Sequence, residues 1–412
     1  MDVTRGRHDP HTGGMPGARD RRDAVRTGAR VAAVGVVLLV AVVARQVAIR
    51  HIPIDYDEDD YLRAGQQYAA AIVSGDWAAF TQENYRPEHP QLAKIAYGVA
   101  LATQPQVPLV PDRSSNAPPA AVLPQPQFGV ARDTAAAFGI LEVLLLALLN
   151  PLAGLFLATG TWQIKYTTEV MLEALPALTS ALVAVCYLAA LRWPRHRTAW
   201  LAASGVALGL TAAGKYVYCL VGIAVAIEWL WSTRARAHPR SGGAGAALRA
   251  AAGWLGPLAG WGLLALAVFF VADPYLWPDP VGRLAGAVSY HLAYAHSQHV
   301  LDAGYPPWQP LIWLTESVPW HPGAFLVSAD LAVTVAAVGG LWRAWHRHRL
   351  YVVWLAVALL FLLAWPTKWP QYILVLTFPL AMVAADGVSA VVLDPIRRWT
   401  SSAIARVPGF AR

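Results

Sequence analysis

The feature that most constrains this chain is a repeated series of long apolar segments that carry no formal charge. Residues 31–44, 252–271 and 351–365 are examples. A soluble protein can bury one such helix in its core, but many of them fit only the hydrocarbon of a bilayer. Only 14% of the residues are charged, against about 25% in soluble domains. The sequence therefore predicts an all-α polytopic membrane protein with roughly ten transmembrane helices.

Arginine-rich segments alternate with the apolar ones and predict the topology. They occupy residues 5–30, 192–197, 234–249, 343–349 and 397–412. Short loops rich in Lys and Arg stay in the cytoplasm, so the net charge of +7 indicates sidedness and not a nucleic-acid partner. The predicted spans are 31–48, 133–149, 152–167, 170–191, 198–214, 216–231, 252–272, 323–341, 350–366 and 369–390.

This map places the chain in the cell membrane as a multi-pass protein with both termini in the cytoplasm. Residues 1–30 are then a disordered tail, 31–390 the transmembrane domain, and 391–412 a C-terminal tail. The long apolar run at 134–162 is broken by Asn150-Pro151, which predicts a tight helical hairpin because proline removes a backbone donor. One long helix there is the alternative, and it would invert part of the map.

Two long segments leave the membrane on the predicted outer side, at about 49–132 and 273–322. In the first, helical spacing of apolar residues over 61–72 predicts a helix that lies on the membrane surface. The stretch 93–102 is too short to span and suits a second such helix. The Pro-rich stretch 104–128 predicts an irregular loop. Any external chemistry must therefore be carried by these two loops and the ends of the spans.

The first outer loop opens with five acids in six positions, Asp55 and Asp57 to Asp60. Like charges this close repel one another unless cations or altered protonation compensate. An EF-hand is excluded because Asp60 stands where its glycine is needed and Gln66 where its bidentate glutamate is needed. A solvated acidic loop and a catalytic carboxylate cluster both remain open. The surrounding residues favour the catalytic cluster.

The chain has only four lysines, Lys94, Lys165, Lys215 and Lys368, and all lie near predicted outer ends of spans. Residual lysines in an arginine-biased genome are the simple explanation. Cations on the outer side often pair with an anion, however, and a phosphate is the obvious candidate.

No cofactor is indicated with certainty, and no metal site is assigned. His296 and His299 have the i, i+3 spacing that lets two histidines share a divalent cation with the acidic cluster, although surface histidine pairs are commoner. Cys186 and Cys219 lie in separate apolar runs and suit small packing residues, without disulfide or zinc spacing.

Several short motifs share this predicted outer face. They are Asp57-Glu58-x-x-Tyr61, His89-Pro90-x-Leu92, Tyr166-Thr167-Thr168-Glu169, the end of a span at Lys215, Pro274 to Pro280, and Lys368-x-x-x-Tyr372. In this order they resemble the GT-C superfamily of membrane glycosyltransferases, in particular protein O-mannosyltransferases and lipid A aminoarabinose transferases. The resemblance covers residues 31–390. Two departures are a Gln at position 91, where the family has proline, and an apparent insertion at 103–128.

The resemblance implies a single inverting transfer of a hexosyl or pentosyl group from a polyprenyl-phosphate carrier to a hydroxyl acceptor. Asp57 would act as general base, and Glu58 would orient the acceptor or hold a cation. Lys215 and Lys368, with Arg63 or His89, would neutralise the phosphate leaving group. Tyr61 and Tyr372 belong to the same motifs. Glu169 and Glu173 would add a second carboxylate, or else they are acids at a helix start.

Two other classes of function compete with a transferase. A transporter or flippase for a lipid-linked or anionic substrate predicts ionisable residues near the middle of the membrane and an internal repeat. Glu142 lies within a predicted span, but the acids gather at one face and no clear repeat is visible. A non-catalytic membrane subunit would not need lysines and carboxylates to converge. We therefore expect Asp57, Lys215 and Lys368 to line one cavity.

Overall fold

A computed structural model describes residues 18–112, 120–234 and 244–395. Within these residues every regular element is helical and no strand occurs, which confirms the all-α class. The helices of the central bundle are α1 (Ala18–His51), α5 (Gln127–Leu149), α6 (Pro151–Thr159), α7 (Thr161–Tyr166), α8 (Ala174–Arg192), α9 (Arg197–Gly214), α10 (Leu220–Arg234), α11 (Ala244–Ala272), α15 (Asp330–Arg347), α16 (Arg349–Ala364) and α17 (Leu374–Val388).

Shorter helices and turns connect the bundle. The short α-helices are α2 (Glu58–Ser74), α3 (Ala79–Gln82), α4 (Leu92–Leu101), α12 (Pro280–Tyr294), α13 (Gln298–Asp302) and α14 (Gln309–Thr315). The 3₁₀ turns are η1 (Pro194–His196), η2 (Tyr216–Cys219), η3 (Pro274–Leu276), η4 (Pro322–Ala324) and η5 (Pro370–Ile373), and a π turn, η6 (Ser389–Leu393), follows α17. The two surface helices predicted after the first span correspond to α2 and α4.

Five helical segments of the described chain are long and apolar enough to cross a membrane, by length and composition. They are Val25–His51, Ala174–Arg192, Tyr216–Thr233, Leu255–Ala272 and Pro370–Val392. A polytopic membrane protein is consistent with this result, and the count of roughly ten spans stays a prediction. The other predicted spans coincide with helices that are shorter or less apolar. The segment predicted at 323–341, for example, becomes helical only at Asp330, because residues 322–324 form the η4 turn.

The break at Asn150 has the predicted consequence, a turn between α5 and α6. Asn150 caps α6: its side-chain oxygen accepts hydrogen bonds from the backbone N–H groups of Leu152, at 3.0 Å, and Ala153, at 3.4 Å. Pro151 takes the first helical position, where its missing N–H is harmless. A Cβ on Gly154 would lie 2.6 Å from Cα of Ala147, so the absence of a side chain lets the two helices approach closely. The hairpin is confirmed.

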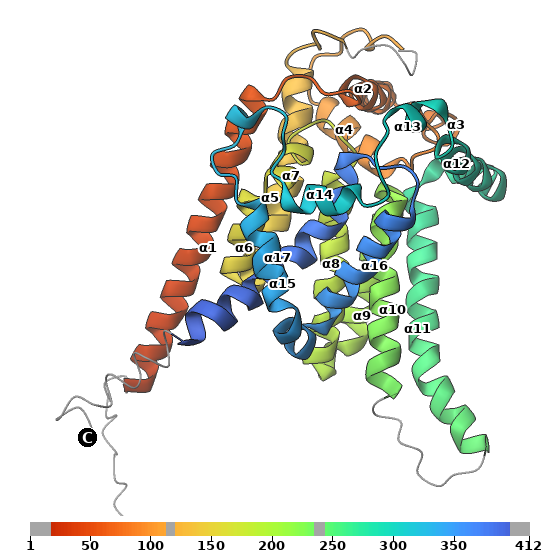
Figure 1. Cartoon of the computed structure of the whole chain (residues 1–412). Coiled ribbons are helices and arrows are strands. Elements are labelled where there is room, and N and C mark those ends of the chain that lie inside the picture. Colours follow the sequence, from red (N-terminus) through yellow and green to blue (C-terminus); the bar gives the residue numbers. More distant parts are fainter. Residues whose placement is uncertain (1–17, 113–119, 235–243, 396–412) are drawn as a thin grey trace, which may run out of the picture.

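Figure 1 shows α2, α3, α4, α12 and α13 gathered over one end of the helix bundle. The α8–α9 and α15–α16 connections lie at the opposite end, where α1 begins. The arginines of 192–197 and 343–349 therefore lie far from the two loops predicted to be outside. Helix α1 begins at Ala18, earlier than the predicted start at 31, and residues 1–17 and 396–412 of the predicted tails lie outside the described residues.

The acid within a predicted span, Glu142, belongs to a side-chain network between helices. It accepts a hydrogen bond from Nε2 of Gln163 at 2.5 Å, and Oε1 of Gln163 accepts one from the Thr377 hydroxyl at 2.8 Å. Glu142 lies on α5, Gln163 on α7 and Thr377 on α17. A buried carboxylate that is bonded in this way is a helix-packing element, so it adds no support for a transport path.

A close glycine contact joins α15 to α17 and gives a test of the packing. A Cβ on Gly340 would lie 2.6 Å from the backbone nitrogen of Gly387, whereas one on the neighbouring Gly339 would meet nothing within 4 Å. We expect Gly340→Ala to lower the free energy of unfolding by about 1–3 kcal/mol through overpacking. Thermal unfolding of the purified protein in detergent measures this. Gly339→Ala is the matched control, and equal midpoints for the two variants would contradict the observed packing.

Candidate functional site

The five acids of the first outer loop differ in what their carboxylates contact. Four have partners: Asp55 pairs with Lys165, Glu58 with Arg132 at 2.5 Å, Asp60 with Arg86 at 2.6 Å, and Asp59 accepts the Ala120 backbone N–H at 3.2 Å. Asp57 is different. Among the described residues, no group donates a hydrogen bond to its carboxylate and no cation pairs with it within 4 Å. The predicted repulsion is therefore relieved by cations from other elements at three of the acids.

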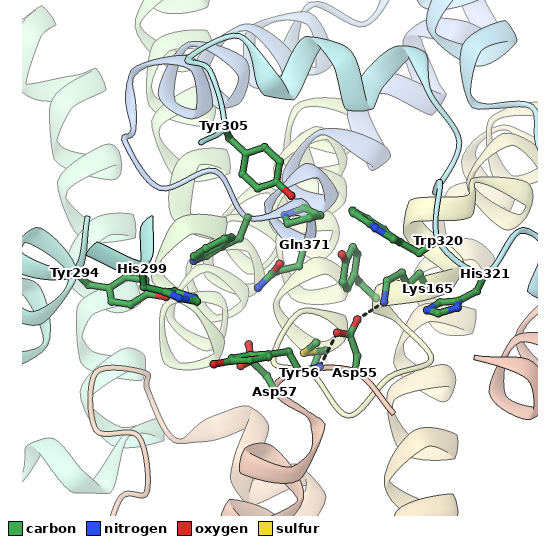
Figure 2. A pocket seen from close by; sticks show the side chains of 14 residues that line it. Asp55, Tyr56, Asp57, Lys165, Tyr294, His299, Tyr305, Trp320, His321 and Gln371 are labelled. Atoms are coloured by element: carbon green, nitrogen blue, oxygen red, sulfur yellow. Dashed lines mark hydrogen bonds and ion pairs between the residues drawn. The ribbon is translucent and has the colours of Figure 1, made fainter. Parts of the chain in front are cut away.

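Asp57 stands directly before α2, at a position where aspartate usually caps the helix. Its side chain makes no capping hydrogen bond. The carboxylate instead lines two adjoining cavities, one of about 400 Å³ and one of about 680 Å³. Figure 2 shows it beside Tyr56 at the edge of the smaller cavity. Burial raises the pKa of Asp57 to about 7, although the positive charge of Lys215 opposes this rise.

Predicted site residues from four parts of the chain meet in the larger cavity. Tyr61, His89, Lys215 and Tyr372 line it together with Asp57. Lys215 follows the last turn of α9 in an extended conformation, which turns its side chain toward the site. Its ammonium pairs with buried Glu173 and lies 5.4 Å from the ring centre of Tyr372. The cavity therefore holds an unpaired carboxylate and a cation whose only charge partner among the described residues is Glu173.

An apolar groove of about 470 Å³ adjoins this cavity. Lys215, His89 and Tyr372 line both of them. The rest of the groove is mostly hydrocarbon and aromatic, from Val217, Leu220, Ile223, Leu284, Val288, Leu292, Phe361 and Trp365. These residues come from η2, α10, α12 and α16 and the residue that follows α16. A polar head and an apolar tail of one ligand would thus find matching surfaces side by side.

Other predicted residues lie beside the cavity instead of lining it. Glu58 is fully buried, pairs with Arg132 and accepts the Val170 backbone N–H at 2.8 Å. Arg63 donates to the Val110 carbonyl at 2.5 Å. Glu169 is fully buried against Lys165, at 2.5 Å. These groups hold the segments that carry the lining residues.

Lys368 does not join Asp57 and Lys215. Its ammonium donates to the backbone carbonyls of Leu362, Leu363, at 3.1 Å, and Trp365. These carbonyls lie at the end of α16, where backbone acceptors lack helical partners. Lys368 therefore caps a helix. Of the three residues expected to share one cavity, Asp57 and Lys215 do so.

Lys94 also has hydrogen-bond partners, and they lie in a loop whose contact with it the sequence did not predict. Its ammonium donates to Oδ1 of Asn84 at 2.6 Å and to the carbonyls of Tyr85 at 2.9 Å, Arg86 at 2.8 Å and His89 at 2.9 Å. Burial lowers the pKa of Lys94 to about 7. The lysine thus fixes the loop that brings Arg86 and His89 to the cavity.

Sequence reasoning missed several lining residues from the second outer loop and beyond. His291 on α12 lies with its ring centre 5.2 Å from that of His89, and its Nε2 is 3.0 Å from the Glu88 carbonyl. Trp369 and Gln371 line both cavities. Their position within the Lys368-x-x-x-Tyr372 motif was the available signal. Arg86 has a left-handed backbone, with φ of 59°, which is uncommon for a residue other than glycine and frequent at functional sites.

A shared metal site for His296, His299 and the acids finds no support in the described residues. No group of three or more His, Cys, Asp or Glu side chains is arranged there to hold a metal ion. Nδ1 of His296 bonds the Leu292 carbonyl at 2.9 Å, and the His299 ring packs against Tyr56 and Trp369.

Comparisons with known proteins give structural matches only. No protein-family model matches, and no curated protein sequence matches. ArnT from Cupriavidus metallidurans bound to undecaprenyl phosphate is 16% identical, with a TM-score of 0.57 over 92% of this chain. The apo ArnT structure gives 17% and 0.55 over 91%.

The Pmt1–Pmt2 protein O-mannosyltransferase complex of S. cerevisiae gives a TM-score of 0.43 at 17% identity, over 61% of this chain and 34% of the other. This chain covers 63% of the length of each ArnT structure. Identities this low bear on the fold alone. They confirm the resemblance seen in the motifs at that level: the described helices share the fold of the two ArnT structures.

Proposed function

We propose that this chain is a membrane glycosyltransferase that moves a sugar from a polyprenyl-phosphate carrier to a hydroxyl acceptor at the outer face. The observation that carries the proposal is the shared cavity of Asp57 and Lys215. A carboxylate without a partner suits a general base, and an ammonium suits a phosphate leaving group. Asp57 and Lys215 lie far apart in the sequence, so packing between neighbouring segments is a poor explanation for why both of them line this cavity.

The apolar groove supports a lipid-linked donor. A polyprenyl chain would lie against the hydrocarbon surface formed by Leu220, Ile223 and Phe361, and its phosphate would reach Lys215. The ArnT structure with a similar fold was solved with undecaprenyl phosphate. Burial of the tail supplies binding energy in proportion to apolar area, and this explains why a catalyst for sugar transfer is embedded in a membrane.

The proposed reaction is a single displacement. The acceptor oxygen attacks the anomeric carbon from the face opposite the phosphate, its proton passes to Asp57, and the carbon–oxygen bond to the phosphate breaks. Lys215 stabilises the negative charge that the leaving phosphate gains. One displacement inverts the anomeric configuration. Glu58, held by Arg132, would position Asp57 as its chain neighbour rather than contact the acceptor.

The finer features of the sequence prediction belong to this proposal. We infer roughly ten spans, both termini in the cytoplasm, and the cavity on the outer side. The arginine-rich turns opposite the cavity support this orientation. The transferred group is a hexosyl or pentosyl unit. Incubating the purified protein with polyprenyl-phosphate sugars and measuring sugar release or transfer tests the proposal, and inactivity toward the whole panel would count against it.

The rate should depend on pH in a way that reports Asp57. A general base is active when deprotonated, and the pKa of Asp57 is raised to about 7. We therefore expect kcat/KM to rise about tenfold per pH unit below pH 7 and to level off above it. Initial rates of transfer between pH 5 and 9 measure the profile. A rate that is flat below pH 7, or that falls with rising pH there, would contradict this role for Asp57.

A further inference from the structure

The smaller cavity beside Asp57 is built differently from the larger one, and nothing so far assigns it a ligand. Its volume of about 400 Å³ lies in the range of small-molecule sites, about 300–1,000 Å³. Aromatic rings form much of its lining, among them Tyr305, Trp320 and Trp369. Figure 2 shows Trp320 and Tyr305 on the side of the cavity opposite Asp55 and Asp57. Aromatic walls thus face a carboxylate edge.

The aromatic rings are available to a ligand. Trp320 is 37% exposed and Tyr305 is 36% exposed, although each also packs edge-on against a buried neighbour. Exposed rings held in this way are rigid platforms. The carbon–hydrogen face of a sugar ring carries a small positive charge and packs well against the negative face of an aromatic ring. Aliphatic lining is almost absent, so a hydrocarbon tail fits here far less well than in the groove beside Lys215.

The polar groups of the cavity suit hydroxyls rather than anions. The one lysine, Lys165, is paired with Asp55 and Glu169, so it has no charge left for an anionic ligand. The larger cavity, by contrast, contains two cations, Arg86 and Lys215, and each of them is paired with a single carboxylate. The side-chain amide of Gln371 lines both cavities and has no hydrogen-bond partner among the described residues, so it can donate to one hydroxyl and accept from another.

From this we infer that the smaller cavity binds the acceptor, and that the acceptor is a neutral saccharide. Its sugar ring would pack on Trp320 and Tyr305, and one hydroxyl would reach Asp57 from the side opposite the Lys215 cavity. The inference rests on the proposed function, because it names the acceptor of that reaction. It distinguishes this chain from enzymes whose acceptor is a peptide hydroxyl or a phosphorylated saccharide, since those need backbone-binding or cationic surfaces.

A binding experiment without donor tests the inference separately from the transfer reaction. Saturation-transfer NMR on the detergent-purified protein uses three probes: neutral oligosaccharides of hexoses and pentoses, a hexose 1-phosphate, and a threonine-containing peptide. We expect contacts to the ring protons of the neutral saccharides. Trp320→Ala should weaken that binding about tenfold, whereas Trp320→Phe should keep most of it. Trp308→Ala is the matched control, because Trp308 is 57% exposed and lines neither cavity.

The donor reaction gives the second readout. KM for the saccharide acceptor should rise about tenfold in Trp320→Ala, whereas Trp308→Ala should leave that KM and the hydrolysis of the polyprenyl-phosphate sugar by water within about twofold. Saccharide binding that is as tight in Trp320→Ala as in the unmodified protein, or binding of the peptide or the phosphorylated sugar in its place, would overturn the inference. Failure of the proposed function looks different: the donor is not consumed, yet saccharide binding that depends on Trp320 persists. Offering the saccharide free and attached to a lipid shows which form is the acceptor.

Discussion

Asp57→Asn is expected to lower the transfer rate by about 10²–10⁴-fold, the usual contribution of a positioned general base. The amide keeps the size of the carboxylate but cannot take up the acceptor proton. Because the Asp57 side chain has no bonded partner in the described part of the chain and does not cap α2, the substitution removes little stabilising interaction. Single-turnover transfer with saturating donor and acceptor measures the loss. The rise in rate toward pH 7 should vanish in the same variant.

Two controls separate this effect from damage to the loop. Asp76→Asn changes an exposed acid of the same outer segment, beyond the end of α2, and should leave transfer unchanged. The thermal midpoint of Asp57→Asn should match that of the unmodified protein. Full transfer activity in Asp57→Asn would remove Asp57 from the mechanism. Asp60, the carboxylate of the larger cavity that is nearest to Asp57 in sequence, is bound to Arg86 and is therefore a poor substitute for the base.

Lys215→Met is expected to reduce kcat by about 10²–10³-fold, because an electrostatic contact to the developing phosphate charge is lost. The raised pKa of Asp57 should increase further, since Lys215 is the group that opposes the rise. The alkaline plateau of the pH profile should therefore begin at higher pH. Rates measured with a polyprenyl-phosphate sugar, across the same pH range, report both changes.

The partner of Lys215 complicates the single substitution and also provides its control. Removing the ammonium leaves Glu173 buried without its cation, which alone can destabilise the fold. The double variant Lys215→Met/Glu173→Gln removes both charges and should recover stability without recovering kcat. Arg195→Met, at an exposed site at the opposite end of the bundle, should affect neither quantity. Recovery of kcat in the double variant would show that Lys215 acts only by neutralising Glu173.

Much of the fold could be predicted from local features of the sequence. The apolar segments, the hairpin at Asn150 and the surface helices α2 and α4 follow from composition, periodicity and one Asn-Pro pair. Each depends on residues that are neighbours along the chain. The grouping of the arginine-rich turns at one end follows likewise from charge counted loop by loop. The five-acid cluster and the few lysines also indicated, from the sequence alone, where the candidate site lies.

Which of those acids and lysines stand in the cavity was decided only by the tertiary structure. The partners of Asp55, Glu58 and Asp60 lie 110, 74 and 26 positions away in sequence, so no local pattern could show that they are paired and Asp57 is not. No local pattern could show either that Lys368 bonds carbonyls at the end of α16 whereas Lys215 lines the cavity. Composition and periodicity determine which segments enter the membrane, because burial in lipid depends on each segment alone. Pairing and exposure depend on which segments become neighbours, and only the folded bundle determines that.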